Sequence, residues 1–177
     1  ISTLPTFGAK WLIPRLPQLA RVQPQLQVHI EARSRPFLFS ELQVEAALFA
    51  GTPAQLRQWA GTQADWLFDE EVVPVCSPSL LRGGRPVTPA ALADMPLLQQ
   101  STRPEAWRQW FDAQGVDAEH ALAGPRYELF SMQAAAAEAG LGVALMPTLL
   151  VQEELAAGRL VVACNRRLSG QRGYYLV

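Results

Sequence analysis

The chain has 177 residues, of which 49% are hydrophobic and 18% are charged, and its formal net charge is −1. This length allows one ordinary domain or two small lobes with cores of their own. A nearly neutral chain offers no basic face for nucleic acid and no acidic tail. The longest apolar runs, such as residues 143–146, are too short to cross a bilayer. These properties predict a soluble globular protein without a membrane segment.

The chain begins with Ile1, and the first two residues look like the middle of a strand. No basic segment followed by an apolar stretch is present, so the sequence shows no signal peptide. We therefore expect this chain to be a fragment of a longer protein.

The first loop combines hydroxyls with aromatic side chains. Thr3 and Thr6 stand at the mouth of a predicted helix, and Phe7 and Trp11 flank them. Helix N-termini have unpaired N–H groups and favour negative charge, so this loop is a candidate site for a small anion such as a carboxylate. The alternative interpretation is that Thr6 only caps the helix.

Residues 9–22 have helical spacing, since Leu12, Leu16 and Leu19 recur at i, i+4 and i+7. Pro14 and Pro17 predict a bend in this helix. Alternating residues 26–30 predict a half-buried strand, and residues 36–43 a connection with a short helical segment.

Residues 44–49 form a compact apolar run that is typical of a central parallel strand. Gly51 and Thr52 follow it. In open α/β sheets ligands bind outside the carboxyl ends of the strands, so Phe49 and Thr52 mark a second candidate ligand loop. An ordinary Gly-Thr-Pro turn is the alternative.

Residues 66–75 predict a long strand whose acidic run, residues 69–71, is interpreted as a solvated edge and not as catalytic carboxylates. Residues 77–88 are rich in Pro, Gly and Arg, which indicates a lobe boundary.

In the second half, a short helix opens at Thr88, and residues 96–99 form a strand. Thr102 and Glu105 have the spacing of a capping box for a helix that ends at Gly115. Ser131 is predicted to cap an alanine-rich helix over residues 132–139. The remaining predicted strands are residues 126–130, 143–146, 160–163 and 174–177.

No catalytic, metal or cofactor motif is present. The chain has only two histidines and no phosphate-binding glycine loop, nucleophile elbow or metal-ligand spacing. We therefore expect neither an enzyme nor a bound cofactor or metal. Cys76 and Cys164 are interpreted as buried reduced thiols, with a redox pair as the alternative.

Strands and helices alternate in two blocks, which predicts an α/β fold with mostly parallel sheets. Each block has hydroxyls where strand ends meet helix starts. Two lobes whose polar loops face one cleft would grip a small molecule by hinge closure.

Several segments carry a family resemblance. They are FGAKWLIPRLP (residues 7–17), WLFDEEVVPVCSPSLL (66–81), AWRQWFDAQG (106–115), AAAAEAGLGVALMP (134–147), LAAGRLV (155–161) and GYYLV (173–177). In this order they resemble the effector-binding domain of LysR-type transcriptional regulators, in the subgroup of the glycine-cleavage and β-lactamase activators.

The resemblance implies two Rossmann-like lobes joined by two crossing hinge strands, as in periplasmic binding proteins. Lobe I would be residues 1–75, lobe II residues 76–164, and residues 165–177 the return strand toward lobe I. The crossing strands would lie near residues 72–76 and 174–177. A small-molecule inducer would sit between the lobes.

The resemblance also implies a cytoplasmic regulator that forms homodimers, or tetramers at full length, through helix 9–22 and either helix 132–139 or its neighbour. DNA would be bound only by an N-terminal winged helix-turn-helix that this fragment lacks. A C-terminal helix usual in the family is also missing here.

One segment departs from the family pattern. Close members often read V-D-L-A-I-R-F-G where residues 44–51 read VEAALFAG, so this segment lacks the Arg that is common there. The polar chemistry under the cleft should therefore differ.

The predicted inducer site combines hydroxyls and helix N-termini for a polar or anionic head with aromatic rings for an apolar part. Its residues are Thr3, Thr6, Phe7, Phe49, Thr52, Ser101, Thr102, Phe130 and Ser131. The alternative function is a solute-binding receptor of a transport system with the same bilobal fold.

Overall fold

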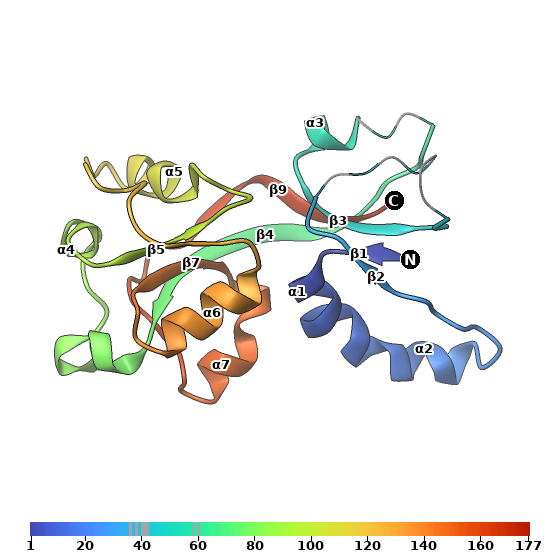
Figure 1. The fold of residues 1–177 in the computed structure, drawn as a ribbon, viewed down its shortest axis with the longest axis horizontal. Helices are drawn as coiled ribbons and strands as arrows, with labels where there is room; N and C mark the ends of the chain where they lie inside the picture. The colour runs from blue at the N-terminus through green and yellow to red at the C-terminus, as the bar shows by residue number, and fades with distance from the viewer. Residues whose placement is uncertain (36, 38, 40–42, 58, 60) are drawn as a thin grey trace. The chain divides into compact units, whose positions relative to one another are not determined.

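The computed structural model describes residues 1–35, 37, 39, 43–57, 59 and 61–177. The chain forms two compact units, Ile1–Glu70 with Ser169–Val177, and Glu71–Leu168. The chain enters the second unit within strand β4 (Asp65–Cys76) and leaves it at the start of strand β9 (Leu168–Leu176), the long green and red strands of Figure 1. These two strands are therefore the only backbone links between the units.

The first unit is built on a sheet with the order β2-β1-β3-β9-β4. Its short strands are β1 (Ser2–Thr3), β2 (Glu31–Ala32) and β3 (Ala47–Gly51). β1 is parallel to both β2 and β3, and β3 is antiparallel to β9. The strand predicted over residues 26–30 is wrong, because only the two residues after it join the sheet. The predicted connection over residues 36–43 lies mostly outside the described residues.

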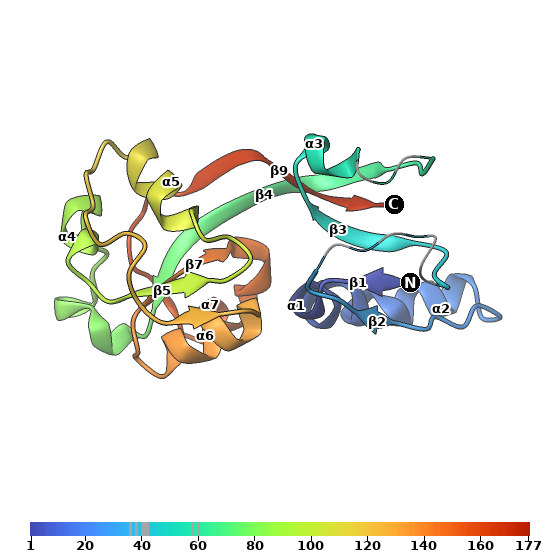
Figure 2. The ribbon, with the colours of Figure 1, turned by 45° about the horizontal axis from the view of Figure 1, so that its top comes forward.

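The helical run of the first unit starts four residues earlier than predicted. It comprises α1 (Pro5–Phe7), a wide π-type turn (Gly8–Leu12), a 3-10 turn (Ile13–Arg15) and α2 (Leu16–Val22). The change of helix type occurs where Pro14 removes a backbone donor, and the Ile13 N–H instead reaches back to the Gly8 carbonyl. Figure 2 shows this run beside β1 and β2. A further short helix, α3 (Pro53–Leu56), follows β3.

The sheet of the second unit has the order β4-β7-β5-β6, with β8 on β4. β5 is parallel to its neighbours β6 and β7. Its strands and α-helices are β5 (Leu97–Gln100), β6 (Arg126–Tyr127), β7 (Val143–Pro147), β8 (Val161–Val162), α4 (Pro89–Ala93), α5 (Ala106–Ala113), α6 (Phe130–Glu138) and α7 (Gln152–Ala156). Short 3-10 turns cover Pro78–Leu80, Arg82–Gly84 and Thr148–Leu150.

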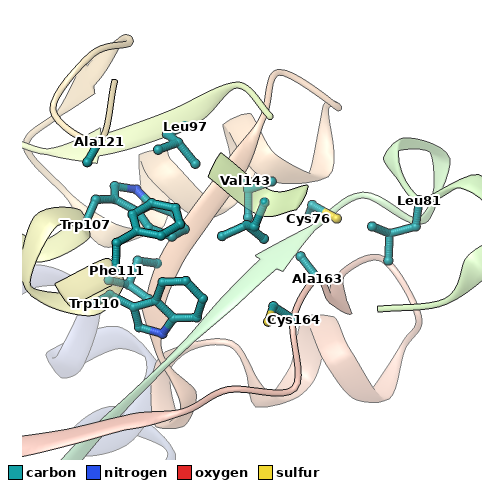
Figure 3. Packing of buried hydrophobic residues seen from close by; sticks show 12 residues of the cluster. Cys76, Leu81, Leu97, Trp107, Trp110, Phe111, Ala121, Val143, Ala163 and Cys164 are labelled. Carbon is teal, nitrogen blue, oxygen red and sulfur yellow. The ribbon is translucent and has the colours of Figure 1, made fainter. Parts of the chain in front are cut away.

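Two apolar clusters fill the second unit. On one side, Trp107, Trp110 and Phe111 of α5 pack with Leu97 and Val143 (Figure 3). On the other, the alanines of α6 pack closely on Leu98, Ala144 and Met146 of the sheet. Small alanine side chains let this helix lie close to the strands, as the sequence suggests.

The helix starts correct three sequence expectations. The short helix opens at Thr88 as expected, and the Thr88 hydroxyl caps α4 by accepting a hydrogen bond from the Ala91 N–H at 3.3 Å. α5 begins only after Glu105, because residues 101–105 form turns, so Thr102 caps nothing. Ser131 is the second residue of α6 and not its cap, and Thr6 is likewise inside α1.

Two glycines with left-handed backbones allow a stability test. A Cβ on Gly124 (φ 113°) would lie 2.1 Å from the Leu97 carbonyl oxygen of β5, whereas one on Gly158 (φ 68°) would meet nothing within 4 Å. We expect Gly124→Ala to lower the free energy of unfolding by about 2–4 kcal/mol through strain and overpacking. Gly158→Ala should cost about 1 kcal/mol from backbone strain alone. Urea unfolding compares the two, and equal losses would contradict this account.

Candidate functional site

In the first unit, the predicted site residues gather at the carboxyl end of the parallel strands. Thr3 ends β1 and is paired in register with Leu48 of β3, and Phe49 lies one residue further along β3. Thr6 sits in the helical turn that directly follows β1. Thr3 and Thr6 are both buried, with 2% and 6% of their surface exposed. The parallel register therefore brings the two predicted ligand loops of this unit together.

The aromatic residues of this unit have different surroundings. Phe7 is fully buried, and its ring stacks on Trp11 at 4.9 Å and on Tyr174 at 4.5 Å between centroids. Phe49 is half-buried and meets Trp59 edge-on at 4.9 Å. Phe7 thus supports the helix start from within the core, whereas Phe49 keeps part of its surface exposed.

Thr52 is tied to the helix that it precedes. It is the N-cap of α3, and its backbone N–H donates to the side-chain oxygen of Gln55 at 2.9 Å, as in a capping box. The sequence analysis predicted a capping box at the start of α5, with Thr102 as its cap. The structure has one at the start of α3 and none at α5. The partner of Thr52 is Gln55, a residue that the sequence analysis did not weigh.

The second unit repeats this arrangement. β5 and β6 run parallel with Gln100 opposite Tyr127, and the Ser101 N–H donates to the Tyr127 carbonyl at 2.8 Å. Ser101 and Thr102 are exposed just after β5. Phe130 and the exposed Ser131 are the first two residues of α6, whose N-terminus has no side-chain cap. All four predicted residues of this unit therefore lie where strand ends meet the start of α6.

Two residues of the second unit were missed by the sequence analysis. The Arg103 guanidinium lies over the Phe130 ring, 4.8 Å from its centroid, and brings positive charge to the start of α6. Gln100 is 4% exposed and its side-chain nitrogen has no hydrogen-bond partner. Both residues adjoin Ser101 and Thr102 in sequence, so proximity to a strand end was the signal that could have found them.

The acidic run on β4 is not simply a solvated edge. Glu70 is 4% exposed, and its carboxylate lies 3.3 Å from the side chain of Arg172 on β9. The interpretation of residues 69–71 as solvated is therefore wrong for Glu70. The sequence could not reveal this pairing, because it depends on the register of strands about a hundred residues apart.

Both cysteines are free thiols in the core of the second unit. Both are buried, and burial raises the pKa of the Cys76 thiol to about 11 and raises that of Cys164 as well. Cys76 is paired with Val161, three residues before Cys164, and the two sulfurs point to opposite sides in Figure 3. Their place in the apolar core and their suppressed ionisation agree with the interpretation as structural thiols.

The described part of the chain offers neither a cluster of metal ligands nor a membrane-spanning helix. No group of three or more His, Cys, Asp or Glu side chains that could hold a metal ion occurs there. None of the helices there is long and apolar enough to cross a membrane.

With this geometry in place, comparison with known proteins identifies the family. The family model described as LysR substrate binding domain matches residues 1–177. The chain therefore belongs to the LysR substrate-binding domain family. The resemblance inferred from the sequence is confirmed.

Two relatives illustrate the relationship. The chain is 35% identical over 178 residues to the glycine cleavage system transcriptional activator of Escherichia coli K12, covering 100% of this chain and 57% of the relative. It is 39% identical over 155 residues to the HTH-type transcriptional regulator TrpI of Pseudomonas aeruginosa, covering 86% of this chain and 51% of the relative. The chain thus spans little more than half of each of these regulators.

A solved structure supports the fold. The effector domain of the transcriptional regulator AmpR of Pseudomonas aeruginosa superposes with a TM-score of 0.84 at 25% identity, covering 99% of this chain and 81% of that one. The effector-binding domain of AmpR from Citrobacter freundii gives a TM-score of 0.85 at 24% identity, over 99% and 84% of the two chains. The predicted α/β fold of the LysR effector domains, similar to periplasmic binding proteins, is confirmed.

The buried thiols give a prediction about reactivity. With a pKa of about 11, the Cys76 thiolate is only about one thousandth of the population at pH 8, and its access is blocked. We expect both cysteines to resist iodoacetamide in the native protein at pH 8 and to react at the normal rate in 6 M urea. Mass spectrometry of timed samples measures this. Rapid native labelling of either cysteine, or a disulfide between them after mild oxidation, would contradict it.

Proposed function

We propose that this chain is the effector-binding part of a LysR-type transcriptional regulator and that it binds a small polar or anionic molecule. The observation that carries the proposal is that, in each unit, hydroxyl-bearing residues gather where parallel strands end and a helix begins. Such ends present backbone N–H groups and positive dipole to a ligand. The LysR family membership supports this interpretation.

The charge of the second unit favours an anionic head group. The Arg103 guanidinium and the N-terminus of α6, which has no side-chain cap, both bring positive charge to these residues, and both would attract a carboxylate. The exposed hydroxyls of Ser101, Thr102 and Ser131 would supply hydrogen bonds beside them. In the first unit, Phe49 would pack on the apolar part of the ligand.

We further propose that the two units are the two lobes of the domain and that one effector contacts the strand ends of both. Binding would favour a closed arrangement of the lobes. The effector would shift the equilibrium between open and closed lobes by as much as its affinity differs between them. β4 and β9 would act as the crossing strands of the hinge. The scheme works by binding alone and assigns no chemical step to the chain.

The whole protein would be a cytoplasmic regulator that binds DNA through a separate domain. This chain covers 57% of the length of the glycine cleavage activator of Escherichia coli, so a regulator of that length has room for a further domain. The two relatives named above are a transcriptional activator and an HTH-type transcriptional regulator, so they favour a regulator over the solute-receptor alternative.

Several exposed apolar side chains on the helical run of the first unit are candidates for a self-association contact. Ile13, Leu19 and Val22 are 51%, 37% and 70% exposed along the helical run, and on α6 of the second unit Met132 is 53% exposed. Apolar side chains gathered on one helix commonly mark protein–protein contacts. We propose that these two helices meet in a homodimer, as the family resemblance implies.

The ligand site is tested by thermal shift with acetate, glycine, L-glutamate and N-acetylmuramic acid. A ligand at about a hundred times its dissociation constant adds about 2.7 kcal/mol of stability. We expect Ser131→Ala to weaken binding of any stabilising probe about fivefold, because one hydrogen bond at the start of α6 is lost. Ser79→Ala, which removes an exposed hydroxyl bonded to Ser77, is the control. Equal affinities of both variants and the parent chain would refute the assignment.

The dimer is tested by placing charge among the exposed apolar side chains of this helical run. We expect Val22→Glu to convert the chain to a monomer, because a carboxylate cannot be buried unpaired in an apolar contact. Gln18→Glu adds the same charge to an exposed position of the same helix and should leave association unchanged. Sedimentation equilibrium measures both. A Val22→Glu chain that remains dimeric would contradict the proposed interface.

A further inference from the structure

Two neighbouring acids on β4 stand at the point where the chain passes from one unit to the other. Glu70 is the last residue of the first unit before the crossing, and Glu71 is the first residue of the second. Successive side chains of a strand point to opposite faces, so the two carboxylates point away from each other. Each is paired with a different arginine, and both arginines come from the chain segment that returns to the first unit.

In the first unit, Glu70 holds Arg172 of β9. The Glu70 side chain is 2% exposed and lies 3.3 Å from Nε of Arg172. The same guanidinium donates from Nη2 to the Ala50 carbonyl at 2.8 Å. Ala50 lies within the proposed ligand loop, residues 49–52. Arg172 thus links a buried carboxylate directly to the backbone of that loop.

In the second unit, Glu71 holds Arg167. Nη1 of Arg167 lies 2.6 Å from the Glu71 carboxylate, which also accepts from the Thr148 hydroxyl at 3.3 Å. The Thr148 hydroxyl lies at the same distance from the Glu71 carbonyl. This second pair is more exposed, at 57% for Arg167 and 38% for Glu71. It fixes the chain just before β9 to β4 and to the turn after β7.

We propose that the two ion pairs anchor the return strand to each unit separately, and that Arg172 is a positioning residue for the ligand loop at the end of β3. The second part rests on the proposed function, since it assumes that residues 49–52 contact the effector. Arg172 acts through the Ala50 carbonyl and so sets where Phe49 and Thr52 lie. A shift of β9 in this unit would therefore displace residues 49–52 through the bond between Arg172 and the Ala50 carbonyl.

The segment between the two ion pairs, residues 169–171, has room to change its backbone angles. Residues 169–171 are exposed, and a Cβ on Gly170 would meet nothing within 4 Å. The boundary between the units falls at its start, between Leu168 and Ser169. With Arg167 fixed to one unit and Arg172 to the other, a change in the backbone angles of the return strand would be confined to these few residues.

Hydrogen–deuterium exchange of the unliganded chain tests the separate anchoring with two matched variants. We expect Arg172→Met to speed amide exchange in residues 47–52 about tenfold and to leave residues 143–150 unchanged. Arg167→Met should speed exchange in residues 143–150 and leave residues 47–52 unchanged. Equal effects of both variants on both segments, or no effect on either, would overturn the proposal.

Unfolding measurements test the Glu70–Arg172 pair itself. Arg172→Met removes the cation beside a buried carboxylate, so we expect a larger fall in Tm than for Glu70→Gln, which leaves a partly exposed arginine. The double variant should recover part of the loss. Additive losses in the double variant would show that the two side chains do not act as a pair.

A conservative variant separates positioning from stability. Arg172→Lys keeps a charge beside Glu70, but a single ammonium does not reproduce the guanidinium fork that also reaches Ala50. We expect a nearly unchanged Tm with faster exchange in residues 47–52. The dissociation constant of whichever of acetate, glycine, L-glutamate or N-acetylmuramic acid binds should rise about threefold or more. Faster exchange at an unchanged dissociation constant would overturn the positioning role and leave the anchoring intact.

The two proposals fail differently. If none of the four probes stabilises the parent chain while the exchange pattern follows the two arginines, the binding proposal and the positioning role are both refuted and the anchoring stands. If a probe binds but exchange ignores the arginines, the binding proposal stands and the anchoring is refuted.

Discussion

The second unit depends on one carbonyl oxygen, that of Leu98 in β5. It accepts the indole N–H of Trp107 at 2.9 Å and the side-chain N–H of Gln133 at 2.8 Å, so α5 and α6 are both bonded to one point on the strand. All three groups are buried, and a buried carbonyl or amide without a partner is costly. The distance of α5 from β5 and that of α6 from β5 are therefore both fixed by this one oxygen. The start of α6 and the turn after β5, which carry the proposed ligand groups, inherit their positions from these bonds.

The first unit depends in the same way on a buried polar group, the Glu70 carboxylate. A buried carboxylate requires a cation, and Arg172 supplies it while also bonding to the Ala50 carbonyl. The sheet of this unit has few long strands, so this contact adds a side-chain link between β4, β9 and β3. The same need for pairing thus fixes the strand end in the first unit and the helix start in the second.

The sequence predicted the parts of the fold that follow from local pattern. The long strand over residues 66–75, the buried strand ending at Met146 and the alanine-rich helix all follow from hydrophobic period and composition, which are local properties. Capping was mispredicted at Thr102 and Ser131, because a hydroxyl before a helical pattern does not say at which residue the backbone turns helical. The strand over residues 26–30 failed for a different reason. Alternation there marks a segment with one polar face, and pairing to β1 is decided by tertiary contacts.

The sequence predicted which strand ends carry the candidate site. It did not predict which charged side chains pair beside them. Hydroxyls after strands are visible in the sequence, and the parallel registers then bring them together. Arg172 and Glu70 meet only through the pairing of β9 with β4, and no spacing in the sequence encodes that register.

The same register bears on the arginine that β3 lacks. The family pattern often has an arginine in this strand, whereas residues 47–50 are all apolar here. The end of β3 nevertheless has a guanidinium beside it, because Arg172 extends from the neighbouring strand to the Ala50 carbonyl. An arginine on β3 would move with the ligand loop, but an arginine on β9 belongs to a strand that begins at the unit boundary. Placing the charge on β9 therefore links the loop to the segment through which the two units are joined.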